Sequence, residues 1–148
     1  MALLEGDTVV DHRHEVIGRG HAERLVPLIA ELMGGGRADV IVAGCGPGSF
    51  AGVRIGVAAA RGLALGWQVP VHGFSTLALV AAGAAEDIAA AGGGLVVMEG
   101  GHGQWFVQPF AADLSPRGGI RSLLPDDAVL IADELVVGNR AEPFVARR

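Results

Sequence analysis

The chain has 148 residues, of which 51% are hydrophobic and 18% charged, and its formal net charge is −5 with 11 arginines and no lysine. This composition excludes an intrinsically disordered chain, and the absence of lysine excludes a Walker-type phosphate-binding lysine and a Schiff-base lysine. The negative charge is unfavourable for nucleic-acid binding by the chain alone, and the presence of one cysteine excludes an internal disulfide.

The first part of the chain is predicted to contain a hairpin and a helix. Two strands, Ala2–Glu5 and residues 8–15, are joined by a Gly-Asp turn. Apolar residues at helical spacing predict a helix over residues 21–33, and three consecutive glycines end it. Pro27 fits this helix poorly, because a proline inside a helix removes one backbone hydrogen bond.

The middle of the chain is predicted to form a strand–helix–strand unit. Residues 39–45 are a continuous apolar run, which is typical of a strand buried on both faces. A glycine-rich loop and a helix over residues 52–66 follow, then a strand over residues 69–74 and a helix over residues 75–91 that Ser75 caps. This order indicates an α/β fold with parallel strands.

The C-terminal part is predicted to be mainly β. Residues 95–99 and 104–111 are expected to form a second hairpin, residues 129–132 a further strand, and the end of the chain is expected to be irregular. The longest apolar stretch, residues 51–71, contains two arginines and a glutamine, and the start of the chain does not resemble a signal peptide. We therefore expect a cytoplasmic protein without a membrane span.

The glycine-rich loop before the second helix leaves two interpretations open. A strand, a glycine-rich turn and a helix together can hold an anion at the backbone N–H groups of the helix N-terminus. The specific motifs fail, however: Ala51 stands where GxGxxG needs its third glycine, and Pro47 breaks the serine-elbow pattern around Ser49. The alternative is a tight turn with a structural role only.

The helix after this loop carries small residues along one side. They follow one another at steps of three and four residues: Gly52, Gly56, Ala59 or Ala60, and Leu63. Each helical glycine costs about 0.5–1 kcal/mol relative to alanine, and close packing against another backbone offsets that cost. That backbone belongs either to the chain's own sheet or to a second chain, for which Arg54 and Arg61 would be polar anchors at the rim.

No group of residues in the sequence predicts catalysis or a resident metal. The five histidines are not spaced with carboxylates or a cysteine that would complete a metal site. His21 and Glu23 lie two residues apart on a helix and do not face each other, so a capping or interface role is expected. Cys45 is expected to be an inert, buried packing thiol, and Trp105 and Phe106 to belong to the core.

Three blocks of the sequence resemble one protein family. Residues 46–66, GPGSFAGVRIGVAAARGLALG, resemble the GPGSFTGLRIG-type signature of the TsaB family, also called YeaZ-like proteins. Residues 20–27 resemble the family's H-[ST]-[EQ]-x-L-x-P helix, in which Pro27 is expected, and residues 70–77 resemble its P-x-x-G-V-S-T-L turn. The resemblance extends over about residues 2–111.

The resemblance implies an actin/Hsp70-like (ASKHA) α/β fold, with a mixed sheet and flanking helices. It implies an N-terminal lobe over residues 1–93 and a partial C-terminal lobe over residues 94–148. It further implies a non-catalytic partner of a TsaD-type catalytic subunit in making threonylcarbamoyladenosine (t6A) on tRNA, together with a TsaE-type ATPase. Alone, the chain would form a homodimer; tRNA would be reached only through the complex, and any ATP or ADP would lie at the interface with the catalytic partner.

The resemblance also places the partner contact on the glycine signature and on the start of the first helix. The expected interface residues are Gly46, Pro47, Gly48, Ser49, Phe50, Gly52, Arg54, Gly56, Ala59, Ala60, Arg61, Leu63, His21 and Glu23. The chain is expected to have no catalytic residue, no metal ligand and no cofactor of its own.

Three features depart from the family pattern. The family opens with an I-L-A-I-D-T-S-like strand that this sequence does not contain, so we expect a fold truncated at the N-terminus, in which the neighbours of that strand have unpaired backbone groups. Glu99, Gly100 and Gly101 stand where the family has Asp-Ala-Arg, and the C-terminal lobe is shortened. Two alternatives stay open: an actin-like ATPase or kinase that uses the loop for phosphate, and a glycoprotease-like metallopeptidase.

Overall fold

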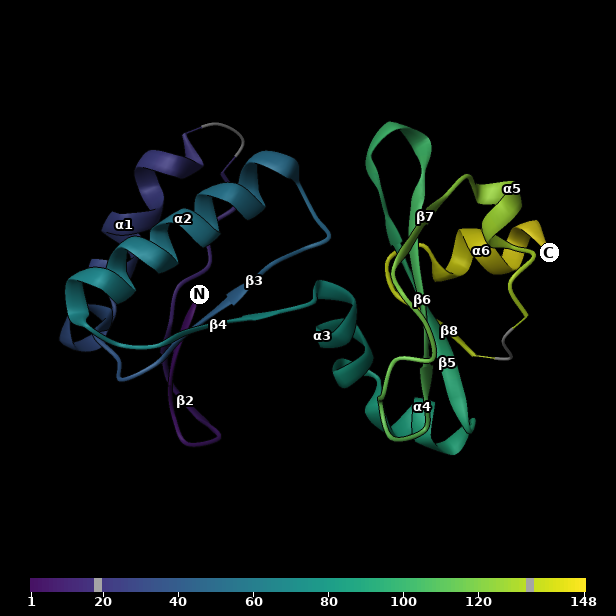
Figure 1. Ribbon diagram of the computed structural model, residues 1–148, viewed down its shortest axis with the longest axis horizontal. Coiled ribbons are helices and arrows are strands. Elements are labelled where there is room, and N and C mark those ends of the chain that lie inside the picture. Colours follow the sequence, from purple (N-terminus) through teal and green to yellow (C-terminus); the bar gives the residue numbers. More distant parts are fainter. Residues whose placement is uncertain (18–19, 133–134) are drawn as a thin grey trace. The chain divides into compact units, whose positions relative to one another are not determined.

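The computed structural model describes residues 1–17, 20–132 and 135–148. The chain forms two compact units (Figure 1): unit 1 is Met1–Cys45 with Phe50–Gly73, and unit 2 is Gly46–Ser49 with Phe74–Arg148. The boundary between the two units lies after Gly73, whereas the lobe boundary was expected after residue 93. The reason is that the helices following Gly73 bury their apolar side chains against the sheet of unit 2.

The described residues of unit 1 form two strand pairs and three helices. Its elements are β1 (Ala2–Glu5), β2 (Thr8–His12), α1 (His21–Ala30), the 3-10 helix η1 (Met33–Gly36), β3 (Ile41–Gly44), α2 (Phe50–Trp67) and β4 (Val71–Phe74), whose last residue begins unit 2. Pro27 lies inside α1, as the sequence block implies. Gly36 ends η1 with φ +70, and a Cβ there would lie 2.6 Å from the carbonyl oxygen of Ile29, so only glycine fits.

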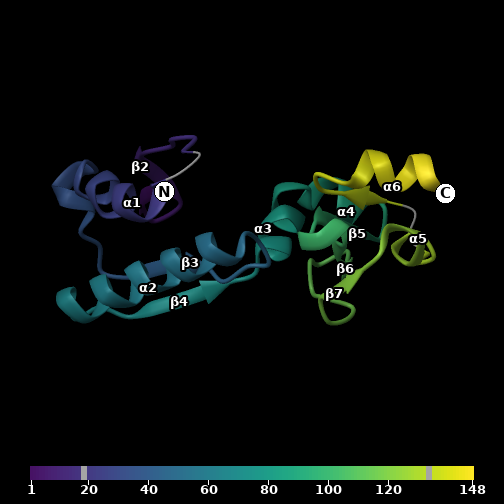
Figure 2. The ribbon, with the colours of Figure 1, turned by 90° about the horizontal axis from the view of Figure 1, so that it is seen from above.

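The strands of unit 1 form two separate pairs. β1 pairs with β2 in an antiparallel hairpin, and β3 pairs with β4. No backbone pairing joins these two sheets within the described residues. α2 connects β3 to β4 and lies along β3 (Figure 2).

The strand at residues 39–45 is not buried on both faces as predicted. Val42 is 61% exposed and Val40 is also exposed, whereas Ile41 and Ala43 are half-buried. The apolar run correctly predicted a strand, but it did not predict how many faces of that strand are buried. α2 packs against one face only.

Unit 2 is a four-stranded sheet with helices on both faces. The strands lie in the order β7 (Arg121–Leu123), β6 (Trp105–Ala111), β5 (Gly93–Glu99) and β8 (Val136–Val137). β5 and β6 pair along seven residues and β8 runs parallel to β5. Figure 1 shows α3 (Thr76–Gly83) and α4 (Ala85–Ala90) on one side of this sheet, and α5 (Pro125–Ala128) and α6 (Ala141–Arg147) on the other.

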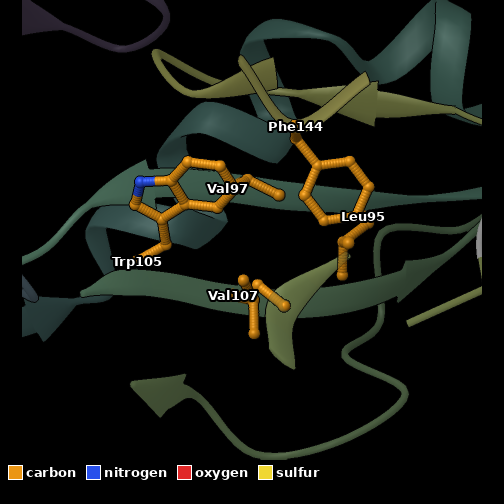
Figure 3. Packing of buried hydrophobic residues seen from close by; sticks show 6 residues of the cluster. Leu95, Val97, Trp105, Val107 and Phe144 are labelled. Atoms are coloured by element: carbon orange, nitrogen blue, oxygen red, sulfur yellow. The ribbon is translucent and has the colours of Figure 1, made fainter. Parts of the chain in front are cut away.

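Successive side chains of β5 and β6 point to opposite faces of the sheet, so each face has its own apolar core. On the α5–α6 face, Trp105 packs near Phe144 of α6 with ring centroids 6.2 Å apart (Figure 3). Figure 3 also shows Leu95, Val97 and Val107 pointing into this cluster. On the α3–α4 face the buried residues are Leu77, Ala81, Ile88, Val96 and Phe110.

Two C-terminal predictions are wrong. Residues 129–132 are not a strand; Val129 and Ile131 instead pack from a turn against the core, which satisfies their alternating pattern without a sheet partner. The end of the chain is the helix α6 rather than irregular, because Phe144 is buried beside Trp105. The helix predicted over residues 75–91 is two helices, broken at Ala84.

Among the helices of the described residues, none has the length and apolar content that a bilayer crossing requires.

Candidate functional site

The glycine loop at Gly46–Ser49 is hydrogen-bonded to the start of α3. Gly46 is buried with φ +89, and its carbonyl oxygen accepts a hydrogen bond of 2.9 Å from the backbone N–H of Thr76. The Ser75 hydroxyl oxygen accepts from the backbone N–H of Ala78 at 3.4 Å and caps α3 as predicted. Two sequence blocks that lie far apart in the chain therefore meet at one backbone hydrogen bond, which sequence spacing alone did not indicate.

The helix after the loop exposes a continuous stripe of side chains. We call this set the outer stripe of α2; its members are spaced by four, four, three and four residues, and they are Phe50, Arg54, Ala58, Arg61 and Leu65. Phe50 is 72% exposed and Leu65 83% exposed. The guanidinium carbon of Arg54 lies 3.7 Å from the centroid of the Phe50 ring, a cation–π contact. Apolar residues thus stand at both ends of the stripe and arginines within it.

The two arginines of the outer stripe have no carboxylate partner among the residues that the structure describes. Within the described residues, the ion pairs involve Arg13, Arg24, Arg140 and Arg147, but neither Arg54 nor Arg61. The sequence of α2 contains no aspartate or glutamate. The exposed face of α2 is therefore cationic and apolar, on a chain whose formal net charge is −5.

The small-residue stripe lies on a different part of α2 from the arginines. Gly52, Gly56, Ala59 and Leu63 are half-buried and Ala60 is buried, so the arginines are not the rim of this stripe as expected; they lie on the solvent side of the helix. A Cβ at Gly56 would meet nothing within 4 Å. The packing of this chain alone does not require glycine at that position.

The first turn of α1 carries the remaining expected interface residues. His21 and Glu23 are both exposed. Gly20 is the N-cap with φ +81, and no side chain of the described residues caps the helix. Of the two roles expected for His21 and Glu23, capping is therefore not observed, and an interface role stays a prediction. Glu23 still stands near the positive end of the helix dipole, where a carboxylate is favourable.

Acidic and basic side chains connect the β1–β2 hairpin to α1. The Asp11 carboxylate accepts a 2.8 Å hydrogen bond from the backbone N–H of Met33, and this bond, followed by that from Arg13, lowers the pKa of Asp11. Arg24 pairs with Glu15 and Glu31, and its hydrogen bond lowers the pKa of Glu15. These contacts attach the hairpin and the residues after it to the segment containing α1 and η1, and we assign them a structural role.

Side chains that could ligate a metal do not gather at one place within residues 1–17, 20–132 and 135–148. All five histidines are exposed, and no three His, Cys, Asp or Glu side chains gather into a metal-binding group in the described part of the chain. Cys45 is exposed rather than buried, since β3 ends before it. Trp105 is buried in the core, as expected.

Glu99 to Gly101, which depart from the family pattern, have structural contacts. The Glu99 carboxylate pairs with Arg140, and its backbone N–H donates to the Asn139 side chain at 2.9 Å. A Cβ at Gly100 would lie 2.7 Å from the carbonyl oxygen of Gln104, so the hairpin end requires glycine there.

Unit 2 also has a surface pocket of about 550 Å³. None of the expected interface residues lines it; the lining residues are Ala91, Gly92, Gly93, Arg117, Val129, Leu130, Ala132 and Arg148.

Comparisons with known proteins agree on one group of relatives. The family model described as TsaD: tRNA N6-adenosine threonylcarbamoyltransferase matches residues 13–134. The tRNA threonylcarbamoyladenosine biosynthesis protein TsaB of Escherichia coli (strain K12) is 41% identical over 86 residues, which are 55% of this chain and 37% of that protein. TsaB of Bacillus subtilis (strain 168) is 30% identical over 142 residues, which are 91% of this chain and 58% of that protein.

Among solved structures, YeaZ from Pseudomonas aeruginosa is similar with a TM-score of 0.77 and 29% sequence identity. The superposition covers 99% of this chain and 72% of that one. The chain therefore matches a large part of a known structure, while it spans only 37% and 58% of the two curated relatives.

Proposed function

The chain belongs to the TsaB (YeaZ-like) family and has its actin-like (ASKHA) α/β fold, and on this premise we propose that it is a non-catalytic partner subunit in t6A formation on tRNA. In this role it binds a TsaD-type subunit, which transfers the threonylcarbamoyl group to adenosine. The relatives are named as t6A biosynthesis proteins, and this supports the pathway.

The observation that carries the partner role is the exposed surface of α2. Phe50 and Leu65 are largely exposed to solvent at the two ends of the outer stripe. Exposed apolar side chains on one helical stripe are typical of a docking surface. The contact region comprises this helix, the loop Gly46–Ser49 before it, and His21 and Glu23 of α1.

The dispersal of reactive side chains supports a non-catalytic role. A transferase or peptidase site needs a nucleophile with a base, or a metal, within hydrogen-bonding or ligand distance. The chain contributes neither metal ligands nor a nucleotide site of its own, and any bound ATP or ADP lies at the interface with the catalytic subunit. tRNA is contacted only through the complex, because the chain's net charge is unfavourable for phosphate.

The same helix supports a homodimer when the catalytic subunit is absent, and a TsaE-type ATPase completes the cytoplasmic machinery. An alternative actin-like ATPase or kinase would bind ATP with micromolar affinity and turn it over as an isolated chain. A metallopeptidase would retain stoichiometric metal after purification.

The test is complex formation with a TsaD-type subunit, measured as molar mass by size-exclusion chromatography with light scattering. We expect a complex with the parent chain and a weaker one with Leu65→Gln, because this change removes an exposed apolar side chain from the outer stripe. Leu79→Gln is the matched control: it makes the same change at an exposed leucine of α3. A Leu65→Gln variant that associates as well as the parent contradicts the α2 interface.

A further inference from the structure

The outer stripe of α2 has the spacing that a second helix needs. Its steps of four, four, three and four residues keep Phe50, Arg54, Ala58, Arg61 and Leu65 on one line along the helix. Side chains repeating at three and four residues interlock with those of a neighbouring helix. The stripe is apolar at its ends, with the small Ala58 between two arginines, so a helix laid on it would cover both arginines.

Covering Arg54 and Arg61 without a counter-charge is unfavourable. A guanidinium removed from water needs acceptors, and an uncompensated buried charge is strongly destabilising. α2 itself supplies no carboxylate, and neither arginine has an ion-pair partner within the described residues. The acceptors must come from the molecule that covers the stripe.

From this complementarity we propose that the surface docking on α2 is an acidic helix, which presents two carboxylates to Arg54 and Arg61 and apolar side chains to Phe50 and Leu65. The two arginines are seven residues apart, which is about 10 Å along the helix axis, so the carboxylates stand about two turns apart. This inference rests on the proposed function, since it specifies the chemistry of the TsaD-type subunit's contact surface.

A second copy of the chain does not supply the missing charges. Its own α2 stripe offers two more arginines and no carboxylate. Self-association through this stripe is therefore weaker than binding of the acidic partner, and salt affects the two complexes in opposite directions. Added salt screens arginine–arginine repulsion in the homodimer and arginine–carboxylate attraction in the complex with the catalytic subunit.

RNA phosphates are the other anions that arginines bind, but the stripe does not suit them. Two cations neutralise few phosphates, and the formal net charge of −5 opposes binding to a polyanion. The exposed Phe50 and Leu65 gain from burial against apolar side chains, which a phosphate backbone does not offer.

The experiment measures the affinity of the full chain for the TsaD-type subunit by calorimetry, with parent and the double variant Arg54→Glu/Arg61→Glu. We expect the double variant to bind about 10- to 100-fold more weakly, because like charges then face each other. Arg37→Glu is the matched control: it reverses an exposed arginine of the same unit outside α2 and leaves the affinity unchanged. Circular dichroism verifies that each variant folds.

Salt provides the second measurement. Raising NaCl from about 50 mM to about 500 mM is expected to weaken the parent's complex and to have less effect on that of the double variant. If the parent binds the TsaD-type subunit and the double variant binds equally well, the acidic-helix inference is wrong while the proposed function stands. If the parent forms no complex, both are wrong. If the double variant loses tRNA binding by the isolated chain but keeps the catalytic subunit, the stripe is an RNA contact.

Discussion

At the scale of single residues, Asp11 and Glu15 link the first hairpin to the segment containing α1. Asp11 receives backbone and arginine hydrogen bonds, and Glu15 receives two from Arg24. These bonds favour the ionised carboxylates and place their pKa values below the ordinary 3.8 and 4.5. Protonation of either group removes the acceptor and therefore loosens the hairpin.

The sign of the resulting pH dependence follows from the lowered pKa values. The stabilisation is fully present above the unfolded-state pKa values and is lost as pH falls through the folded-state pKa values. The urea concentration at the unfolding midpoint should therefore decrease when the pH is lowered from 7 to about 3. Asp11→Asn should reduce this drop, whereas Glu5→Gln, which removes an exposed carboxylate of the same hairpin, should not. An equal drop in the parent and Asp11→Asn would show that Asp11 does not carry the effect.

At the scale of elements, two glycines of unit 1 have opposite roles. Gly56 lies inside α2 with open space at its Cβ position, whereas Gly36 has a left-handed backbone and faces the Ile29 carbonyl. Gly56→Ala should therefore raise the free energy of unfolding by about 0.5–1 kcal/mol. Gly36→Ala should lower it by more than about 1 kcal/mol, because it adds a clash to an unfavourable φ.

Urea denaturation followed by circular dichroism measures both changes. If Gly56→Ala is destabilising, the chain's own packing needs glycine at this position, and the space beside Gly56 does not admit a side chain.

Periodicity predicted the elements better than it predicted their surroundings. The apolar spacing located α1, α2 and the β5–β6 hairpin, since each pattern is a property of the segment itself. It did not reveal that the outer stripe of α2 is uncovered, because exposure depends on the neighbouring elements. The same limit explains residues 129–132, where alternation reflected packing of a turn against the core, and Cys45, whose strand ends one residue earlier than predicted.

At the scale of the whole molecule, the two units differ in how completely they bury apolar side chains. The largest fully buried side chains all belong to unit 2; they are Phe110, Phe144, Leu77, Ile88, Leu95, Val96, Val97 and Val107. Large apolar side chains are exposed in both units, among them Phe50 and Leu65 of unit 1 and Leu130 and Val145 of unit 2, so the units differ in their buried side chains. The reason is that unit 2 has helices on both faces of one sheet, whereas unit 1 has two separate strand pairs and a helix with one exposed face.

This difference sets the expected order of backbone protection in the free chain. Amides in the central strands β5 and β6 are paired and covered on both faces, so they should exchange slowest. Amides of β3 and β4 should exchange faster, since their sheet has two strands only.

Hydrogen exchange followed by mass spectrometry, with and without the TsaD-type subunit, tests most directly whether that subunit binds the chain through α2. We predict slower exchange over residues 50–67 in the complex and no change over residues 93–99 and 105–111. A complex in which residues 50–67 exchange as fast as in the free chain would contradict this role for α2.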